Sequence, residues 1–291
     1  MATDNYLFQD LEYQFMTQLI PYLKNNYFID VGAEKGAFSL LLCNHDMHGA
    51  VIEPLPKHYS VLENLLSQYE NICLYPFAIT NIDTKQPFYV ATNGSEELDY
   101  FHSLQKAESP GIFKHDSYFD VECRSLHSLA TSRLVSTDIG ILKIDTEGND
   151  LNVLRGLGML RPEVVMCEFF NSGIYSGWPE GEPQPIIDYM FSLGYSKFIC
   201  FKNTGSLTFI NTIPVFYSEK SWGNLIFMQD NLHQQISSII TKLIGEHELN
   251  LFRQFEQLNS ELVAKERVIQ QFITDRNVIE TALTTNSPPT V

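Results

Sequence analysis

The octapeptide KIDTEGND, residues 143–150, contains three carboxylates, those of Asp145, Glu147 and Asp150. It follows the apolar run IGIL and precedes a second apolar stretch, LNVLRGL. Carboxylates at the end of a buried strand fit three roles, namely calcium ligands, a base that removes a proton, or caps of the next helix. An EF-hand loop is excluded, because counting from Asp145 the glycine comes fourth and the twelfth residue is Gly156.

The two halves of this segment are predicted to differ in role. Asn149 and Asp150 precede the amphipathic stretch DLNVLRGL, where side-chain oxygens and negative charge favour a helix N-terminus. Asp145 and Glu147 instead follow the strand directly, at the sheet edge where open α/β folds bind ligands. We therefore interpret Asn149 and Asp150 as the start of a helix, and Asp145 and Glu147 as the groups that do chemistry.

Two further residues are candidates for the same site. Glu168 lies near the end of the next predicted strand, in MCEFF. A structural ion pair with Arg155 or Lys143 would explain a glutamate at this position equally well. His102, in DYFHSLQ, is a second candidate base, although a loop histidine is more often surface decoration. Converging carboxylates also fit a divalent metal, which we do not favour because no histidine or dense ligand pattern accompanies them.

A parallel sheet is the element that would bring these residues together. Continuous apolar runs predict strands at FIDV (28–31), GAVIE (49–53), NICLYPF (71–77), GILKID (140–145) and EVVMCEFF (163–170). Amphipathic helical patterns separate them, so the fold class is α/β with a doubly wound, mostly parallel, Rossmann-like sheet. KFICFKN, SLTFIN and NLIFMQ predict an antiparallel completion, and a helix is expected at about 8–24.

The loop after the first strand, FIDVGAEKG, has the pattern of a nucleotide-type ligand site. Asp30, Gly32 and Gly36 fit acidic-x-Gly-x-x-x-Gly, which lacks the second glycine of the dinucleotide fingerprint. The pattern suits a ligand with an adenosine and an amino-acid moiety: Gly32 permits close backbone approach, and Asp30 suits a cationic group. Glu53, at the end of the second strand, can accept hydrogen bonds from both ribose hydroxyls.

Composition narrows the class of protein. The 291 residues are 44% hydrophobic with a formal net charge of −16, which argues against nucleic acid and anionic lipid as partners. No apolar run of eighteen residues is present, and the acidic start lacks the features of a signal peptide. Five cysteines never form a CxxC pair, so we expect free thiols in a reducing cytoplasm.

The region from 231 changes character, so we expect one domain at 1–230 and a helical segment at 231–283. Apolar residues there follow alternating four- and three-residue steps, at Leu251, Phe255, Leu258, Leu262, Ile269, Phe272, Ile279 and Leu283. Lys265 and Arg276 occupy the remaining two seam positions. The pattern favours an intermolecular coiled coil, and hence a homo-oligomer, over a helix folded back on its own domain. Residues 284–291 are expected to be disordered.

Several blocks together resemble the FkbM family of S-adenosylmethionine-dependent methyltransferases. They are FIDVGAEKGAFSLLL, VIEPLPKHYSVLENLL, AIT, ILKIDTEGNDLNVLRGL and VVMCEFF, in order, over roughly residues 26 to 200. The resemblance implies a class I methyltransferase fold and O-methylation of a hydroxyl on a sugar or polyketide-type metabolite. We take the acceptor to be a sugar hydroxyl of a glycan or glycosylated metabolite. The cofactor would contact Asp30, Gly32, Glu34, Gly36, Glu53 and Ala78, with Ala78 near the adenine edge.

The sequence departs from the family pattern at three positions. The family commonly has asparagine where this chain has Glu34, which puts contacts at the methionine end of the cofactor in doubt. It commonly has an acidic residue at Asn149, and the block TLDxL appears as SLHSL with His127. In class I methyltransferases the edge that carries Asp145 and Glu147 faces the transferable methyl group, so the resemblance implies acceptor positioning and proton removal there.

Two rival functions remain open at this stage. One is a catalytically silent methyltransferase fold that serves as an assembly module through its coiled coil, for which the departures leave room. The other is a nicotinamide oxidoreductase, disfavoured because FIDVGAEKG lacks the second phosphate-facing glycine.

Overall fold

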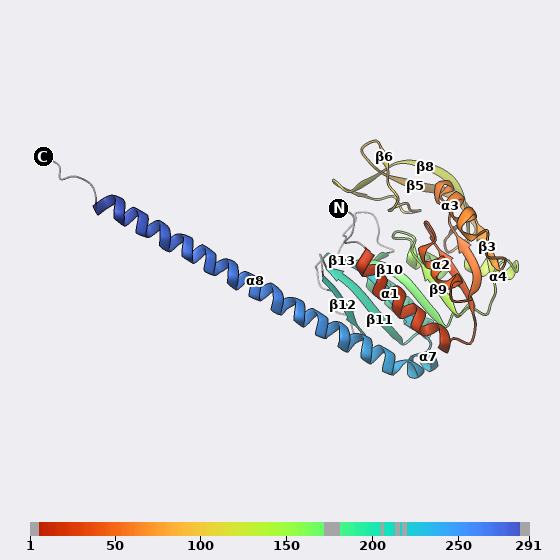
Figure 1. The fold of residues 1–291 in the computed structure, drawn as a ribbon. Helices are drawn as coiled ribbons and strands as arrows, with labels where there is room; N and C mark the ends of the chain where they lie inside the picture. The colour runs from red at the N-terminus through yellow and green to blue at the C-terminus, as the bar shows by residue number, and fades with distance from the viewer. Residues whose placement is uncertain (1–5, 172–180, 205–206, 213–215, 217–219, 286–291) are drawn as a thin grey trace. The chain divides into compact units, whose positions relative to one another are not determined.

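The structure is a computed structural model that describes residues 6–171, 181–204, 207–212, 216 and 220–285 (Figure 1). The chain divides into two compact units, Met1–Ile239 and Ile240–Val291, and each is described by itself.

The first unit is built on an eight-stranded sheet with the order β12-β11-β13-β10-β9-β1-β2-β3. Its parallel strands are β1 (Tyr27–Val31), β2 (His48–Ile52), β3 (Ile72–Tyr75), β9 (Ile141–Ile144) and β10 (Val164–Asn171). The antiparallel strands are β11 (Lys197–Thr204), β12 (Leu207–Asn211) and β13 (Ser221–Met228). The prediction of a mostly parallel sheet with an antiparallel completion is confirmed, since each of these strands overlaps a predicted one.

Helices cover both faces of this sheet. On one face the core joins alternate strand residues to α4 (Leu126–Thr131), α5 (Asp150–Arg155) and α6 (Pro183–Ser192). On the other face lie α1 (Tyr6–Leu19) and α2 (Ala37–Cys43), whose Tyr13 and Phe38 rings are 5.2 Å apart. A 3-10 turn, η1 (Ile20–Tyr22), follows α1 where Pro21 cannot continue an α-helix. The helix predicted at about 8–24 is therefore α1 plus η1.

A second, smaller sheet interrupts the alternation and was not predicted. Its strands are β4 (Ala78–Ile79), β5 (Thr84–Asn93), β6 (Glu96–Glu97), β7 (Glu108–Ser109) and β8 (Phe113–Arg124). Figure 1 shows β5, β6 and β8 grouped apart from the large sheet. In β8 the buried residues Phe113, His115, Val121 and Cys123 alternate with exposed ones. This alternation with a period of two could have predicted a half-buried strand. It was passed over because the strands of the large sheet were found from continuous apolar runs, which β8 lacks.

The first unit also contains α3 (Pro56–Leu66) and α7 (Asp230–Gln235), and α8 (Ser237–Thr285) runs from it into the second. The helix prediction for 231–283 is therefore met by α7 and α8. Phe255, Leu258 and Leu262 of the predicted seam are more than half exposed, at 52%, 57% and 56%. The tail predicted to be disordered lies, from residue 286 onward, outside the described residues.

Four of the five cysteines are small buried side chains. Cys43, Cys123, Cys167 and Cys200 are buried, Cys73 is exposed, and all five are free thiols. Among the described residues, no helix combines the length and the apolarity that a membrane crossing requires.

Candidate active site

The glycine-containing loop after β1 touches the segment after β9. Gly32 has φ +72°, and a Cβ at this position would lie 1.8 Å from the carbonyl oxygen of Asp145. Any other residue would clash with this backbone, so the close approach that requires Gly32 is to Asp145 itself. The ends of β1 and β9 are in register, with Val31 opposite Ile144. The loop predicted to bind a cofactor and the acidic segment therefore share one sheet edge.

Glu53 fixes the same loop from the end of β2. Its Oε2 accepts a hydrogen bond from the Glu34 amide and its Oε1 accepts one from the Leu55 amide, both at 2.8 Å. Burial raises the pKa of Glu53 to about 8. Glu34 has a left-handed backbone with φ +52°, a conformation that asparagine adopts more readily. Asparagine would therefore adopt the backbone conformation of this position with less strain than glutamate.

Asp30 is fully buried and its charge is matched inside the protein. Its Oδ2 accepts a hydrogen bond from Ser39 Oγ at 2.6 Å, and Lys143 Nζ lies 3.4 Å from its Oδ1. Lys143 Nζ also lies 3.2 Å from Asp145 Oδ2. Lys143 is therefore a cationic partner of Asp30 within the chain, and the contact of Asp30 with a cationic group of the cofactor stays a prediction.

Ala78, predicted near an adenine ring, opens the small sheet. It is 3% exposed and packs with Leu55, Phe88, Val121 and Cys123. No contact with a ligand follows from this position, and its proximity to adenine stays a prediction.

The structure brings together the three carboxylates predicted to do chemistry. Asp145, Glu147 and Glu168 each place a carboxylate oxygen within 4.8 Å of the other two. Burial, followed by the charge of Asp145, raises the pKa of Glu147 and of Glu168 well above the usual range for glutamate. The Phe101 amide donates a hydrogen bond to Glu147 Oε1 at 3.1 Å, so a loop of the small sheet positions this side chain.

Two members of this environment were missed. Glu12 of α1 is buried, and its Oε2 accepts a hydrogen bond at 2.7 Å from Asn224, the residue that pairs with Glu168 across β10 and β13. Burial raises the pKa of Glu12 to about 8. Lys143 is the second; the sequence suggested it only as a partner of Glu168, and it instead pairs with Asp30 and Asp145. The sequence held a signal for both, because a charged residue within an apolar pattern is rarely buried without a partner. Glu12 lies beside the apolar stripe of α1, and Lys143 lies within the run ILKI.

Asn149 and Asp150 begin α5, but their side chains act differently from the prediction. Asn149 occupies the N-cap position without a capping side-chain hydrogen bond, and its Nδ2 donates instead to the Ile79 carbonyl at 3.0 Å. Asp150 accepts hydrogen bonds from the Glu168 amide and from Thr146 Oγ1. Burial raises the pKa of Asp150 to about 7. The capping interpretation is corrected, because tertiary partners outcompete the local amides.

His102 holds the small sheet together. Its Nδ1 accepts a hydrogen bond from the Ala91 amide at 3.1 Å, which leaves Nε2 protonated to donate to the Leu98 carbonyl at 2.8 Å. The side chain is buried, and burial lowers its pKa. With both ring nitrogens in use, His102 has no lone pair for an acceptor proton, and the geometry favours a positioning role over that of a base.

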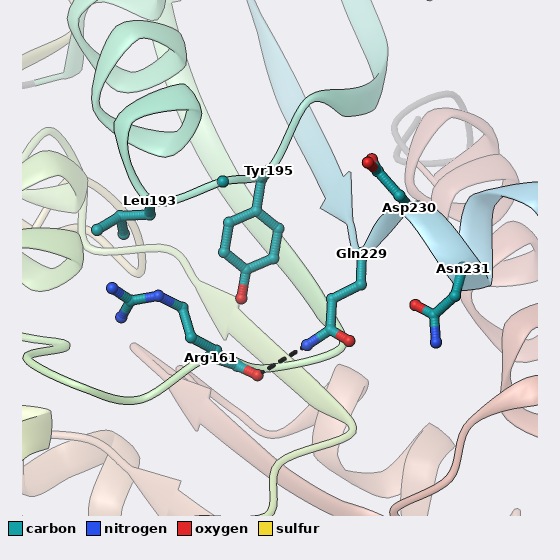
Figure 2. Close-up of a pocket in the computed structure, with 7 residues that line it drawn as sticks. Arg161, Leu193, Tyr195, Gln229, Asp230 and Asn231 are labelled. Carbon is teal, nitrogen blue, oxygen red and sulfur yellow. Dashed lines mark hydrogen bonds between the residues drawn. The ribbon is translucent and has the colours of Figure 1, made fainter.

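A pocket lies at the opposite edge of the large sheet (Figure 2). Tyr195 and Gln229 line it, and Gln229 Nε2 donates to the Arg161 carbonyl at 3.1 Å. Gln229 follows Met228, which pairs with the first residue of β10, whereas Glu168 lies toward the other end of that strand. The pocket is therefore separate from the carboxylate cluster.

Comparison with known proteins identifies one family. A family model described as the methyltransferase FkbM domain matches residues 30–197, more than half of the chain. No curated protein sequence matches.

Solved structures match only distantly. A precorrin-6y C5,15-methyltransferase from Geobacter metallireducens GS-15 is 9% identical with a TM-score of 0.40, over 75% of this chain and 87% of that chain. The N-methyltransferase NodS from Bradyrhizobium japonicum WM9 is 10% identical with a TM-score of 0.41, over 78% and 98%. An rRNA methylase from Streptococcus thermophilus is 8% identical with a TM-score of 0.39, over 79% and 99%. These scores are too low to decide anything about this chain.

Proposed function

The chain belongs to the FkbM methyltransferase family, and we propose that it is an S-adenosylmethionine-dependent O-methyltransferase acting on a hydroxyl of a sugar, a glycan or a glycosylated metabolite. The observation that carries the proposal is the contact between Gly32 and the Asp145 backbone. Through this contact the loop with the cofactor pattern lies directly beside the carboxylate cluster. A methyl donor on the first and an acceptor hydroxyl on the second would then be neighbours.

The residues beside the loop fit this cofactor. Glu53 Oε1 and Oε2 each accept one backbone hydrogen bond, and a carboxylate oxygen keeps a further lone pair for a ribose hydroxyl. Gly32, Glu34 and Gly36 have left-handed conformations, and their amides donate to Ile52, Glu53 and Ala33, so the loop has a fixed shape at the end of β1. S-adenosylmethionine would supply the methyl group on a sulfonium, whose positive charge suits an acidic surround.

Proton removal is the step that the chain's own residues would perform. Asp145 is the favoured base because its side chain is 40% exposed, and can therefore meet an acceptor, while Lys143 holds its Oδ2. The hydroxyl would donate a hydrogen bond to the carboxylate and lose its proton to it as the oxygen–methyl bond forms and the sulfur–methyl bond breaks, with S-adenosylhomocysteine as the leaving group. Glu147 and Glu168 would orient the neighbouring hydroxyls, which favours polyhydroxylated acceptors such as sugars.

A methyl-transfer screen tests this proposal. The full chain is incubated with S-adenosylmethionine and a panel of sugars, glycans and glycosylated metabolites, and products are detected by mass as the gain of one CH2. Calorimetry with S-adenosylmethionine is run in parallel on Glu53→Ala and on the control Glu70→Ala, at an exposed glutamate. We expect at least tenfold weaker binding for Glu53→Ala and no change for the control. No measurable binding by the unaltered chain would favour the silent assembly module instead.

We also propose that the protein is a cytoplasmic homo-oligomer joined through α8. Phe255, Leu258 and Leu262 are exposed at the spacing of a heptad seam, and pairing of two identical helices would bury them. The five free thiols agree with a reducing compartment.

A further inference from the structure

Three carboxylates converge at one point of the sheet edge, and two of their buried oxygens have no N–H or hydroxyl donor. These are Oε2 of Glu147 and Oε2 of Glu168, which accept no such hydrogen bond from any residue that the structure describes, and the Glu168 carboxyl is within hydrogen-bond reach of the Asp145 carboxyl. A buried carboxylate oxygen without a donor is costly and calls for an explanation. Both oxygens belong to the group of carboxylates that lie within 4.8 Å of one another.

The charges at this point do not balance within the described residues. Lys143 is the cation in contact with the cluster, and it is shared between Asp30 and Asp145. Lys35, the nearest basic neighbour in the glycine-containing loop, is held 2.7 Å from Asp99. Glu147 and Glu168 thus have no basic partner among the described residues, and as carboxylates they would be two uncompensated buried charges, which protein interiors rarely tolerate. One divalent cation would neutralise both.

We propose that Asp145, Glu147 and Glu168 bind one hard divalent cation, Mg²⁺ or Mn²⁺, on which the acceptor's hydroxyl oxygens complete the coordination. Oxygen ligands suit these ions, and three carboxylates leave about half of an octahedron open. Bonds of about 2.1 Å put neighbouring ligand oxygens about 3 Å apart, so the side chains would close by roughly 2 Å at most. The half-exposed Asp145 side chain gives the ion a route from solvent.

The role of the ion would be to orient and acidify the acceptor. A hydroxyl bound to a divalent cation loses its proton more readily, and two adjacent hydroxyls can bind one ion together. The role of the ion toward the acceptor rests on the proposed methyl transfer to a hydroxyl. Binding of the ion to the three carboxylates does not depend on that function. The sequence pattern did not favour a metal, because no histidine or dense ligand pattern accompanies these carboxylates. The tertiary structure adds the convergence of their oxygens on one point.

Metal binding can be tested without cofactor or acceptor. The full chain is stripped with EDTA, dialysed and titrated with MnCl2, and free Mn²⁺ is followed by electron paramagnetic resonance. We expect one bound Mn²⁺ per chain, displaced by MgCl2. Glu147→Gln and Glu168→Gln should each weaken binding at least tenfold. Glu12→Gln makes the same change from acid to amide at a buried neighbour outside the triad and should change binding less than threefold.

The outcomes separate this inference from the proposed function. No bound Mn²⁺, or equal weakening by Glu12→Gln and Glu168→Gln, would overturn the metal site. If a glutamine variant fails to fold, the wild-type chain still decides, because Mn²⁺ must raise its melting temperature. Methyl transfer that is unchanged in EDTA would leave the proposed function standing without the ion. Stoichiometric Mn²⁺ binding with no methyl transfer to any acceptor would leave the site standing without that function.

Discussion

Asp30 and Lys143 occupy paired positions on β1 and β9, and Lys143 Nζ lies 3.4 Å from Asp30 Oδ1 inside the sheet. The lysine is 6% exposed in its side chain and the aspartate is 0% exposed. Lys143 Nζ makes a second ion pair with Asp145, whose Oδ2 lies 3.2 Å away. The acidic site therefore depends on one buried cation that connects it to the centre of the sheet.

Removing that cation should destabilise the protein strongly. Lys143→Met leaves Asp30 buried and unpaired, so we expect the free energy of unfolding in urea to fall by about 3–5 kcal/mol. The double variant Asp30→Asn/Lys143→Met should recover most of this loss, because no uncompensated charge remains. Lys85→Met, at an exposed position, serves as the control. A loss below about 1 kcal/mol for Lys143→Met would contradict the interpretation of this pair.

Asp145→Asn should abolish turnover while the affinity for S-adenosylmethionine changes less than tenfold. The substitution keeps the shape of the side chain but removes the negative charge that would accept the acceptor proton, a change of about a hundredfold or more in rate. Turnover is measured with the acceptor found in the screen, and affinity by calorimetry. Asp138→Asn, at an exposed aspartate, is the matched control. Wild-type turnover in Asp145→Asn would refute the assignment.

The contribution of His58 to stability should decline on the acid side. Burial lowers the pKa of His58 to about 4, below its usual value of about 6.5, so the folded state keeps it neutral while the unfolded state takes up a proton. The stability that this histidine contributes is present above pH 6.5 and is lost as the pH falls toward 4. Between pH 7 and pH 5 this contribution to the free energy of unfolding should fall by about 2 kcal/mol, while Glu12 and Glu53, whose pKa values are raised, act in the opposite direction.

His58→Phe tests this dependence, because phenylalanine retains the aromatic contact with His102 and does not titrate. The free energy of unfolding in urea is measured at pH 7 and pH 5, and its change on acidification should be about 2 kcal/mol more favourable in His58→Phe than in the wild type. His45→Phe, at an exposed histidine, should show the wild-type change. Identical pH dependence in His58→Phe and the wild type would remove His58 as its source.

Oligomerisation should depend on the seam of α8. Phe255→Lys/Leu258→Lys places two charges where identical helices would meet, so we expect monomers in sedimentation. Gln257→Lys/Ser260→Lys adds the same charge at exposed positions outside the seam and should leave the assembly unchanged. A chain ending at Ile239, the last residue of the first unit, should be a folded monomer. If sedimentation gives the same number of chains per particle for the truncated and the full chain, oligomerisation through α8 is disproved.

Much of the large sheet could be predicted because burial on both faces leaves a local mark. Five parallel strands read as short continuous apolar runs between amphipathic helices, and each was found within a few residues of its position. The small sheet was not predicted, since β5 and β8 are mixed in polarity and their pairing joins Thr84 to Cys123, far apart in the chain. Residues such as Phe101 reached the site only through this sheet.

The sequence by itself determined the family, the loop after β1 and the placement of Asp145 and Glu147 at a strand end, because glycine, charge and apolar spacing are local properties. The tertiary structure decided which side chains contact one another. It paired Asp30 with Lys143, brought Glu168 and Glu12 toward Asp145, and turned Asn149 away from helix capping. These relationships depend on strand register and on packing between distant segments, which no single stretch of residues records.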